Sequence, residues 1–511
     1  MHLRAPDPGR WRTRGGFSAV TQTPDYASFP THKDRRALVA IDLGAESCRV
    51  SLLHWRKGSP SIQLIARIPN APYTDAAGNL RWPFRKLETQ LHSALQSAVA
   101  AAPEGIRSIG VDGWAVDYVR LNAAGQPLED PFCYRDERTV AAKNSLDTKL
   151  TPVEIFKRTG VQPMRINTLY QLVADHMADN QARRWLLLPE YLLHSLGAEP
   201  VAEFTNATHT GLVDTATRDW SPDLFARANL SIVSAPQIVK PGTIVGRLRQ
   251  DICHPPVRSE TMLIAPACHD TASAIAAMQS EVNDSAYLIC GTWSIVGARL
   301  LHPVMADEAR QRGFTNLGAA DGAFCFHTNI NGMWMLKQCV EQWQAEGRAA
   351  ERLEFGALAK AAEAVRLPAE AIFPVDAPEL LLPSGMPQKI LYLLRADTGI
   401  RLSESPDDEA VITRLILNSL AHRYARAIRE LEELSGRRYA RIEVLGGGAR
   451  NALLLQLIAR STGCSVTAGA VEASTLGNFA LQLTAGVSAA DRAVALRQAV
   501  QLCGQAQWEA S

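Results

Sequence analysis

Short apolar runs separated by turns dominate the chain from residue 37 onward. Residues 38–41 (LVAI) form one such run, which predicts a strand covered on both faces. Asp42 ends this run, Gly44 follows it, and residues 50–53 resume an extended apolar pattern. The stretch 37–55 therefore predicts a buried strand, a tight turn and a second strand.

The same pattern returns in the second half of the chain. Residues 286–300 (AYLICGTWSIVGARL) again predict a strand, a Gly-Thr-Trp-Ser turn and a strand. Two similar hairpins, roughly a domain length apart, indicate two halves built on one plan.

The elements after the first hairpin indicate the type of sheet. Residues 61–68 predict a third strand, residues 84–102 a helix with an apolar residue at every fourth position, and residues 107–111 a strand ending at Asp112. Strand, strand, strand, helix, strand is the opening of one half of an actin-like ATPase, whose sheet is mixed. A doubly wound sheet would alternate strands and helices from the start.

Later segments predict further regular elements. They are a helical insert over 136–250, a strand over 324–331, irregular proline-rich structure over 354–399, a helix over 407–434 closed by Gly436, a strand over 441–445 followed by three glycines and a helix, a strand over 466–469 and a helix over 472–484.

Composition narrows the class of protein. A chain of 511 residues is too long for one core, so two domains are expected. The net charge of +1 gives no electrostatic reason to expect binding to nucleic acid or to an anionic membrane, and no apolar run is long enough to cross a bilayer. The nine cysteines include no C-x-x-C pair, which indicates buried free thiols in a reducing cytoplasm. Residues 1–36, rich in proline and arginine, predict a disordered extension or an upstream start codon.

The first hairpin carries residues suited to a polyphosphate. Gly44 lets the backbone approach closely, Ser47 and backbone amides can donate hydrogen bonds, and Asp42 can hold a hydrated Mg²⁺. A nucleotide held between the two hairpins would explain both turns. An ordinary hairpin turn with a solvated aspartate is the alternative.

Two further residues have open interpretations. Asp270 precedes a helix of small residues, 272–278, and is either a catalytic carboxylate or simply the cap of that helix. Trp114 follows the strand at 107–111 and either stacks on a sugar face or packs under its loop.

Nine stretches in order give the chain a resemblance to a known family. They are VAIDLGAESCRV, SIGVDGWAVDYVRL, YRDERT, EFTNATHTGLVD, HDTASAIAA, CGTWSIVG, the segment from Asn329 to Trp334, VLGGGARN and VEASTLGN. The chain resembles the FGGY family of sugar kinases over nearly all of 37–487. The resemblance implies an α/β fold of two actin/hexokinase-like (ribonuclease H-like) ATPase domains with a ligand cleft between them. The implied boundaries are a sugar-binding domain at 37–283, a nucleotide-binding domain at 284–488 and a tail at 489–511.

The resemblance also implies roles for particular residues. Asp270 matches the catalytic aspartate and Asp42 the aspartate that holds Mg²⁺ through water. The residues implied to contact ATP are Ala45, Glu46, Ser47, Cys48, Arg49, Thr292, Lys337 and Gly447. Those implied to line the sugar pocket are Ala115, His269, Thr271 and Asn329.

The activity implied is transfer of the ATP γ-phosphate to the 1-hydroxyl of a ketose. L-rhamnulose is the expected sugar, with L-fuculose or a ketopentose as alternatives, and a catalytically silent sugar-binding regulator as an alternative of another class. Five residues depart from the family pattern: Glu46, Cys48, Ala115, Leu317 and Lys337. These departures leave the choice of sugar open. The chain is expected to be cytoplasmic, as a monomer or a homodimer.

Overall fold

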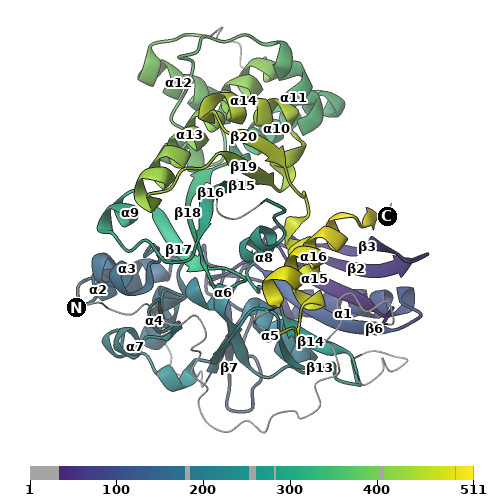
Figure 1. Ribbon diagram of the computed structural model, residues 1–511. Helices are drawn as coiled ribbons and strands as arrows, with labels where there is room; N and C mark the ends of the chain where they lie inside the picture. The colour runs from purple at the N-terminus through teal and green to yellow at the C-terminus, as the bar shows by residue number, and fades with distance from the viewer. Residues whose placement is uncertain are drawn as a thin grey trace.

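The computed structural model describes residues 34–178, 184–252, 260–280, 284–402, 408–488 and 491–509. Two lobes, each built on one sheet, are stacked along the long axis of the molecule (Figure 1). The extension predicted for residues 1–36 lies almost wholly outside the described residues.

The first sheet has seven strands in the order β13-β14-β6-β1-β2-β3-β21. Strand β1 is antiparallel to β2 and parallel to β6, so Asp42 lies opposite both Arg49 and Asp112. The strands are β1 (Ala37–Leu43), β2 (Ser47–Arg56), β3 (Ser59–Pro69), β6 (Ile106–Gly113), β13 (Thr243–Arg247), β14 (Met262–Ala265) and β21 (Gln507–Trp508).

The second sheet has six strands in the order β17-β18-β16-β15-β19-β20. Its centre repeats the first sheet, because β15 is antiparallel to β16 and parallel to β19, as β1 is to β2 and β6. The strands are β15 (Ser285–Cys290), β16 (Trp293–Leu300), β17 (Phe314–Gly318), β18 (Phe324–Asn331), β19 (Arg441–Leu445) and β20 (Ser465–Ala468). Two halves built on one plan, each opening with a hairpin, are therefore confirmed.

Two helices lie between the sheets. Helix α8 (Asp270–Ala276) packs closely on α15 (Ala473–Leu483), and α15 also contacts β1 and β6. In the apolar cluster around α15, Leu38 of the first sheet and Leu445 of the second meet Phe479. The end of the second domain thus packs on the first sheet, which brings residues 473–483 to the ends of β1 and β6.

The remaining helices cover the outer faces and form the insert. Helices α1 (Phe84–Ala101) and α5 (Leu188–Leu196) cover the first sheet. The insert contains α2 (Thr139–Asp147), α3 (Pro152–Thr159), α4 (Thr168–Ala178), α6 (Phe204–Thr208) and α7 (Pro222–Arg227), with short strands β8 (Arg184–Leu187), β9 (Val201–Glu203), β10 (Val213–Asp214), β11 (Asp219–Trp220) and β12 (Gln237–Val239). Strand β7 (Tyr118–Leu121) precedes the insert and pairs with β8. Strands β4 (Tyr73–Thr74) and β5 (Leu80–Arg81) form a separate hairpin.

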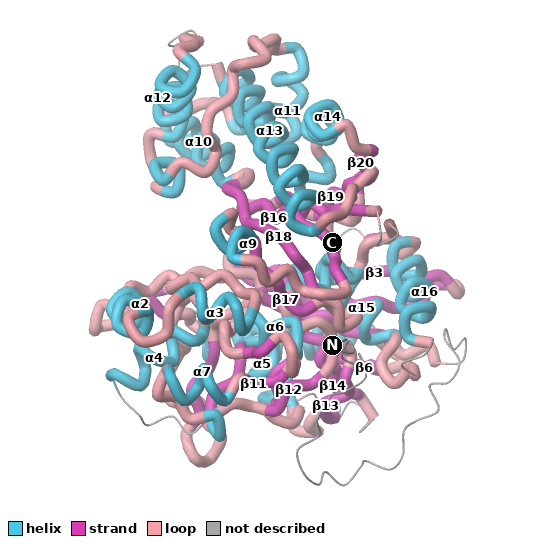
Figure 2. The backbone as a smooth tube through the Cα atoms, turned by 60° about the vertical axis from the view of Figure 1, so that its left-hand side comes forward, coloured by secondary structure: helices cyan, strands magenta, loops and turns pink. Residues whose placement is uncertain are grey.

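Helices gather on the second sheet on the side away from the first lobe (Figure 2). They are α10 (Trp334–Ala345), α11 (Phe355–Ala364), α12 (Met386–Thr398), α13 (Glu409–Ser435) and α14 (Ala452–Thr462), while the short α9 (Asp307–Gln311) precedes β17. Helix α13 ends at Gly436 in the left-handed conformation (φ 66°), which confirms the predicted stop.

Two segments differ from the sequence prediction. Residues 354–399 were expected to be irregular, yet they contain α11 and α12, because prolines are tolerated at the first turn of a helix and Pro387 lies there in α12. Residues 489–511 were expected to be a tail. Within the described part, α16 (Arg492–Gly504) packs on α15 and β21 pairs with β3. None of the described helices combines the length and apolarity needed to cross a membrane.

The contact between α8 and α15 depends on a glycine. A Cβ atom on Gly477 would meet the backbone oxygen of Ser273 at 1.8 Å, so Gly477→Ala must push the two helices apart. We expect a loss of about 1–3 kcal/mol in the free energy of unfolding, measured by denaturant titration. Gly356→Ala in α11 is the control, because nothing lies within 4 Å of its Cβ position. It should be neutral or slightly stabilising; equal stability of Gly477→Ala and the wild type would contradict close packing of α8 on α15.

Candidate functional site

Two carboxylates end neighbouring strands of the first sheet. Asp42 and Asp112 are paired positions on β1 and β6, and both are buried. Asp42 Oδ2 accepts hydrogen bonds from Arg49 Nη2 at 2.5 Å and from Ser474 Oγ at 2.6 Å. Asp112 Oδ2 accepts one from Asn478 Nδ2 at 2.5 Å, whereas its Oδ1 is buried with no protein partner.

A third carboxylate joins them. Asp270 is the first residue of α8, and its Oδ1 accepts hydrogen bonds from the backbone N (2.5 Å) and hydroxyl (3.1 Å) of Thr271. The helix cap is His269, so Asp270 is not the cap but the first residue of the helix. Burial, with added repulsion from Asp42, raises the pKa of Asp270 to about 7. About a third of its side chain (36%) remains open to solvent, so a ligand can reach it.

The same crowding affects Asp112. Burial first, and then the charge of Asp42, raises the pKa of Asp112 well above its usual value, with a smaller contribution from Asp270. Asp42 is thus within electrostatic reach of both Asp112 and Asp270, and its charge disfavours ionisation of each. We call Asp42, Asp112, Asp270 and the two hairpin turns the interdomain site.

Arg49 is the principal cation beside these carboxylates. Its guanidinium pairs with Asp42 and with Glu472, the residue just before α15. Glu472 therefore links the start of α15 to the first hairpin and holds the Arg49 guanidinium in place.

The predicted residues of the first turn separate into two groups. Glu46 and Ser47 lie at the surface of the turn, where Lys337 of α10 approaches Glu46. Ala45 is half-buried against the first core, and the Cys48 side chain is fully buried within it. Burial raises the pKa of the Cys48 thiol to about 12, so its sulfur is an uncharged core group and only its backbone can serve a ligand.

The second hairpin and the triple glycine adjoin each other. Gly446 has φ 79°, which favours glycine, and a Cβ on Gly448 would meet Cys290 Sγ at 2.3 Å. Gly447 between them has nothing within 4 Å of its Cβ position, so this stretch of backbone is open to a ligand. Thr292 is half-buried at the tip of the β15–β16 hairpin.

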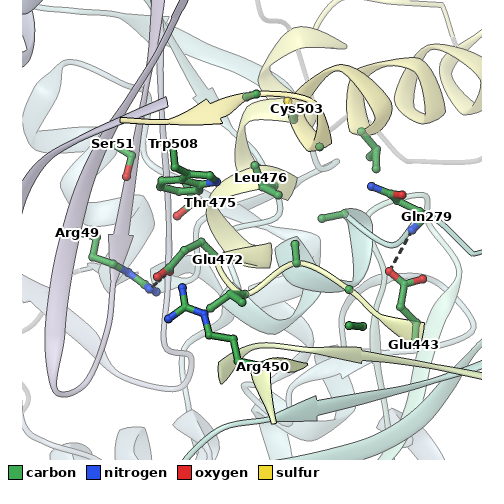
Figure 3. A pocket seen from close by; sticks show the side chains of 18 of the residues that line it. Arg49, Ser51, Gln279, Glu443, Arg450, Glu472, Thr475, Leu476, Cys503 and Trp508 are labelled. Carbon is green, nitrogen blue, oxygen red and sulfur yellow. Dashed lines mark hydrogen bonds and ion pairs between the residues drawn. The ribbon is translucent and has the colours of Figure 1, made fainter. Parts of the chain in front are cut away.

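A cavity of about 710 Å³ lies beside these segments (Figure 3). Its lining joins Arg49 of the first hairpin, Arg450 next to the triple glycine and Glu472 before α15. Trp508 of β21 contributes an aromatic face. The cavity has a volume typical of small-molecule pockets. Of the residues predicted to contact ATP, Arg49 lines it and the other seven do not.

Histidines gather on the other side of Asp270. His269 Nε2 lies 3.4 Å from Asp270 Oδ1, and the ring of His209 contacts that of His269 at a tilt of 46°, with centroids 3.9 Å apart. Burial lowers the pKa of His269 to about 3 and that of His327, on β18, to about 4, and it lowers that of His209 well below its usual value. The group is therefore neutral at physiological pH and suited to hydrogen bonding with hydroxyls.

The sequence prediction did not include His209, although it lies within the EFTNATHTGLVD motif. The sequence marks His209 only as a histidine among small polar residues, which does not by itself indicate a site. Its Nε2 is buried with no protein partner, as are both amide atoms of Asn331 on β18. Asn331 follows the predicted Asn329 by two positions, so both lie on one face of the strand, and Asn329 is exposed.

The predicted loop at Ala115 is held in an unusual conformation. Val116 has φ 72°, a rare value for a β-branched residue, and its carbonyl accepts hydrogen bonds from Thr168 Oγ1 and Gln171 Nε2. The backbone N of Gly113 donates to Cys268 O at 3.0 Å, so the end of β6 contacts the segment that carries His269. Ala115 follows this strand end by two residues. Such strain is common at functional sites.

Trp114 is explained by packing. It is buried (7% exposed), packs on Trp82 with ring centroids 4.7 Å apart, and donates from Nε1 to Asp117 Oδ2 at 3.0 Å. Trp82 donates to the same oxygen at 2.6 Å. The alternative of a tryptophan packed under its loop is therefore the correct one.

Helix α15 supplies residues that sequence reasoning missed. Ser474, Asn478 and Gln482 recur every fourth position and form a polar stripe on an otherwise apolar helix. Ser474 binds Asp42, Asn478 binds Asp112, and Gln482 donates to Val39 O at 2.9 Å. Gly110 on β6 makes room for this stripe, because a Cβ there would meet Asn478 Oδ1 at 2.4 Å.

The carboxyl groups of the interdomain site suit Mg²⁺ that is held through water rather than by direct ligands alone. Within the described residues, no three His, Cys, Asp or Glu side chains converge closely enough to bind a metal ion by themselves. However, the unpartnered oxygen of Asp112, with the carboxyl groups of Asp42 and Asp270 in electrostatic reach, suits a hard cation. Because Mg²⁺ keeps several waters and takes phosphate oxygens as ligands, it would be held here through water and a bound polyphosphate.

Comparisons with known proteins define the class. Residues 37–276 match the N-terminal domain of the FGGY family of carbohydrate kinases, and residues 286–486 match its C-terminal domain. The chain belongs to the FGGY family of carbohydrate kinases, and the predicted actin/hexokinase-like fold is confirmed.

Particular relatives narrow the comparison. The chain is 35% identical to the rhamnulokinase of Klebsiella pneumoniae (strain 342), over 88% of this chain and 89% of that protein. It is 32% identical to the rhamnulokinase of Oceanobacillus iheyensis, over 88% of this chain and 93% of that protein. Among solved structures, a ligand-bound xylulose kinase from Lactobacillus acidophilus superimposes with a TM-score of 0.73 at 14% identity, covering 91% of this chain and 92% of that one.

The raised pKa of Asp270 predicts a pH dependence. A carboxylate that accepts a proton works in its ionised form, which is the form above its pKa of about 7. We expect kcat/KM for the sugar to be level above pH 8 and to fall about tenfold for each pH unit well below 7. Steady-state assays from pH 5 to pH 9 with saturating nucleotide test this, and a level profile down to pH 5 would contradict it.

Proposed function

We propose that this protein transfers the γ-phosphate of ATP to the 1-hydroxyl of a ketose, and that the ketose is L-rhamnulose. The observation that carries the proposal is the position of Asp270. It is a solvent-accessible carboxylate with a raised pKa, between phosphate-type hairpins on one side and neutral histidines on the other.

Asp270 is the proposed general base. A sugar hydroxyl is a poor nucleophile, and a carboxylate within hydrogen-bond reach can accept its proton as the phosphoryl group arrives. The backbone and hydroxyl of Thr271 hold the carboxylate in place. His269 beside it, neutral because its pKa is about 3, can bind a sugar hydroxyl without adding charge.

The other residues bind and orient the phosphates. Arg49 and Lys337 supply positive charge, and the open backbone at Gly447 and the Thr292 turn supply room and hydrogen bonds. Asp42 and Asp112 would hold Mg²⁺ through water. That ion offsets charge on the transferred phosphoryl group and its leaving group.

The choice of L-rhamnulose rests on the relatives of about 35% identity, which are rhamnulokinases. L-fuculose and ketopentoses are the alternatives, because Ala115 and Leu317 depart from the family pattern near the expected sugar. An ADP-release assay against a panel of ketoses tests the assignment. Release with L-rhamnulose at the highest kcat/KM supports it, and release with no sugar at all would favour a silent sugar-binding protein.

Replacement of the base is the first specific test. Asp270→Asn keeps the shape of the side chain but cannot accept the proton, so we expect kcat to fall by about 10²- to 10⁴-fold. ATP affinity, measured by calorimetry, should be retained. Asp223→Asn on α7, which removes an exposed carboxylate elsewhere, should leave both quantities unchanged. Near-normal turnover of Asp270→Asn would exclude Asp270 as the base.

Ala115 tests the sugar pocket. Its methyl group narrows a wall where glycine would let the backbone approach the ketose, and such a group shifts discrimination by about 1–3 kcal/mol. Ala115→Gly should change the ratio of kcat/KM values among ketoses and leave the KM for ATP nearly constant. Kinetics with three ketoses suffice. If every ratio stays the same, Ala115 does not line the pocket.

A further inference from the structure

An ion pair joins the turns of the two domains. Glu46 lies in the turn between β1 and β2, and its Oε1 is 3.0 Å from Nζ of Lys337, in the first turn of α10. The two residues are 291 positions apart in sequence. Each belongs to a different half of the molecule, so the contact spans the interdomain site.

Both charges are fixed to the proposed phosphate-binding segments. The backbone N of Trp334, where α10 begins, donates to Thr292 O at 3.1 Å, and that of Met333 donates to Gly291 O at 3.0 Å. The start of α10 is thus tied to the second hairpin. On the other side, Asn70 N donates to Glu46 O at 2.9 Å, which holds the first turn against the end of β3.

The ion pair between Glu46 and Lys337 is exposed to solvent, and this exposure determines how much it contributes to stability. The Lys337 side chain is 35% exposed and that of Glu46 is 57% exposed, so the contact adds little to stability. Its electrostatic effect is larger, because a lone carboxylate at this turn would repel a polyphosphate. A lysine from the opposite domain removes that repulsion.

We infer that Glu46 and Lys337 act as a matched charge pair that sets the affinity for the nucleotide. Lys337 neutralises the carboxylate of Glu46 at the phosphate-binding turn, and Glu46 holds the ammonium of Lys337 between the two turns. The inference rests on the proposed function for the identity of the nucleotide. Loss of either residue alone would leave an unbalanced charge at the phosphate-binding turns.

The test is a double-mutant cycle with Lys337→Gln, Glu46→Ser and the double variant. At low ionic strength we expect Lys337→Gln to raise both the Kd and the KM for ATP by about three- to tenfold, with the KM for the sugar unchanged. In the Glu46→Ser background the same substitution should raise them less than twofold. The difference between the effects of Lys337→Gln in the two backgrounds should be smaller in 0.5 M salt, since exposed charges are screened.

A control variant shows whether the effect is specific to this ion pair. Lys143→Gln breaks a comparable lysine–carboxylate pair on α2 and should leave the Kd for ATP unchanged. An equal effect of Lys337→Gln with and without Glu46 would overturn the inference, because Lys337 would then act on ATP independently. Calorimetric binding of ATP to the wild type is measured first. If ATP does not bind at all, the proposed function fails, and that result is distinct from additivity in the cycle.

Discussion

The convergence of Asp42, Asp112 and Asp270 is the constraint on which the rest of the structure depends. Burying carboxylates near one another is unfavourable unless each is hydrogen-bonded or paired. Arg49 and Ser474 serve Asp42, Asn478 serves Asp112, and Thr271 serves Asp270. Burial, with added repulsion from Asp42, raises the pKa of Asp270 and Asp112.

This arrangement requires the end of the chain to return to its beginning. Ser474 and Asn478 reach the strand ends only because α15 leaves the second domain and packs on β1 and β6. Gly477 and Gly110 permit the approach, one against α8 and the other against the polar stripe. Substitutions in this helix should therefore affect both stability and the electrostatics of the site, even though α15 lies far from the first hairpin in sequence.

Local patterns in the sequence were enough to predict the central strands of both sheets and the turns that follow them. Three strands could be predicted from their own apolar residues: the strand before Asp42, the strand before Gly291 and the strand before the triple glycine. The pairing of Asp42 with Asp112 depends on register between strands, and the role of Asn478 depends on a crossover between domains. Neither is a local property, so the sequence alone offered only a polar residue at a strand end and a polar stripe on a helix. The roles of Thr292, Gly447 and Asn329 remain predictions carried by the family resemblance.

Charge is distributed unequally on the two sides of Asp270. Towards the hairpins lie Arg49, Lys337 and Arg450, which suit a polyphosphate, and the net effect of Glu46 and Glu472 is to hold two of these cations in place. Towards the insert lie His209, His269 and His327, all neutral because burial lowers their pKa values. A neutral sugar and a highly charged nucleotide would thus each meet a matching environment, and in the proposed reaction Asp270 would accept the sugar proton where the two meet.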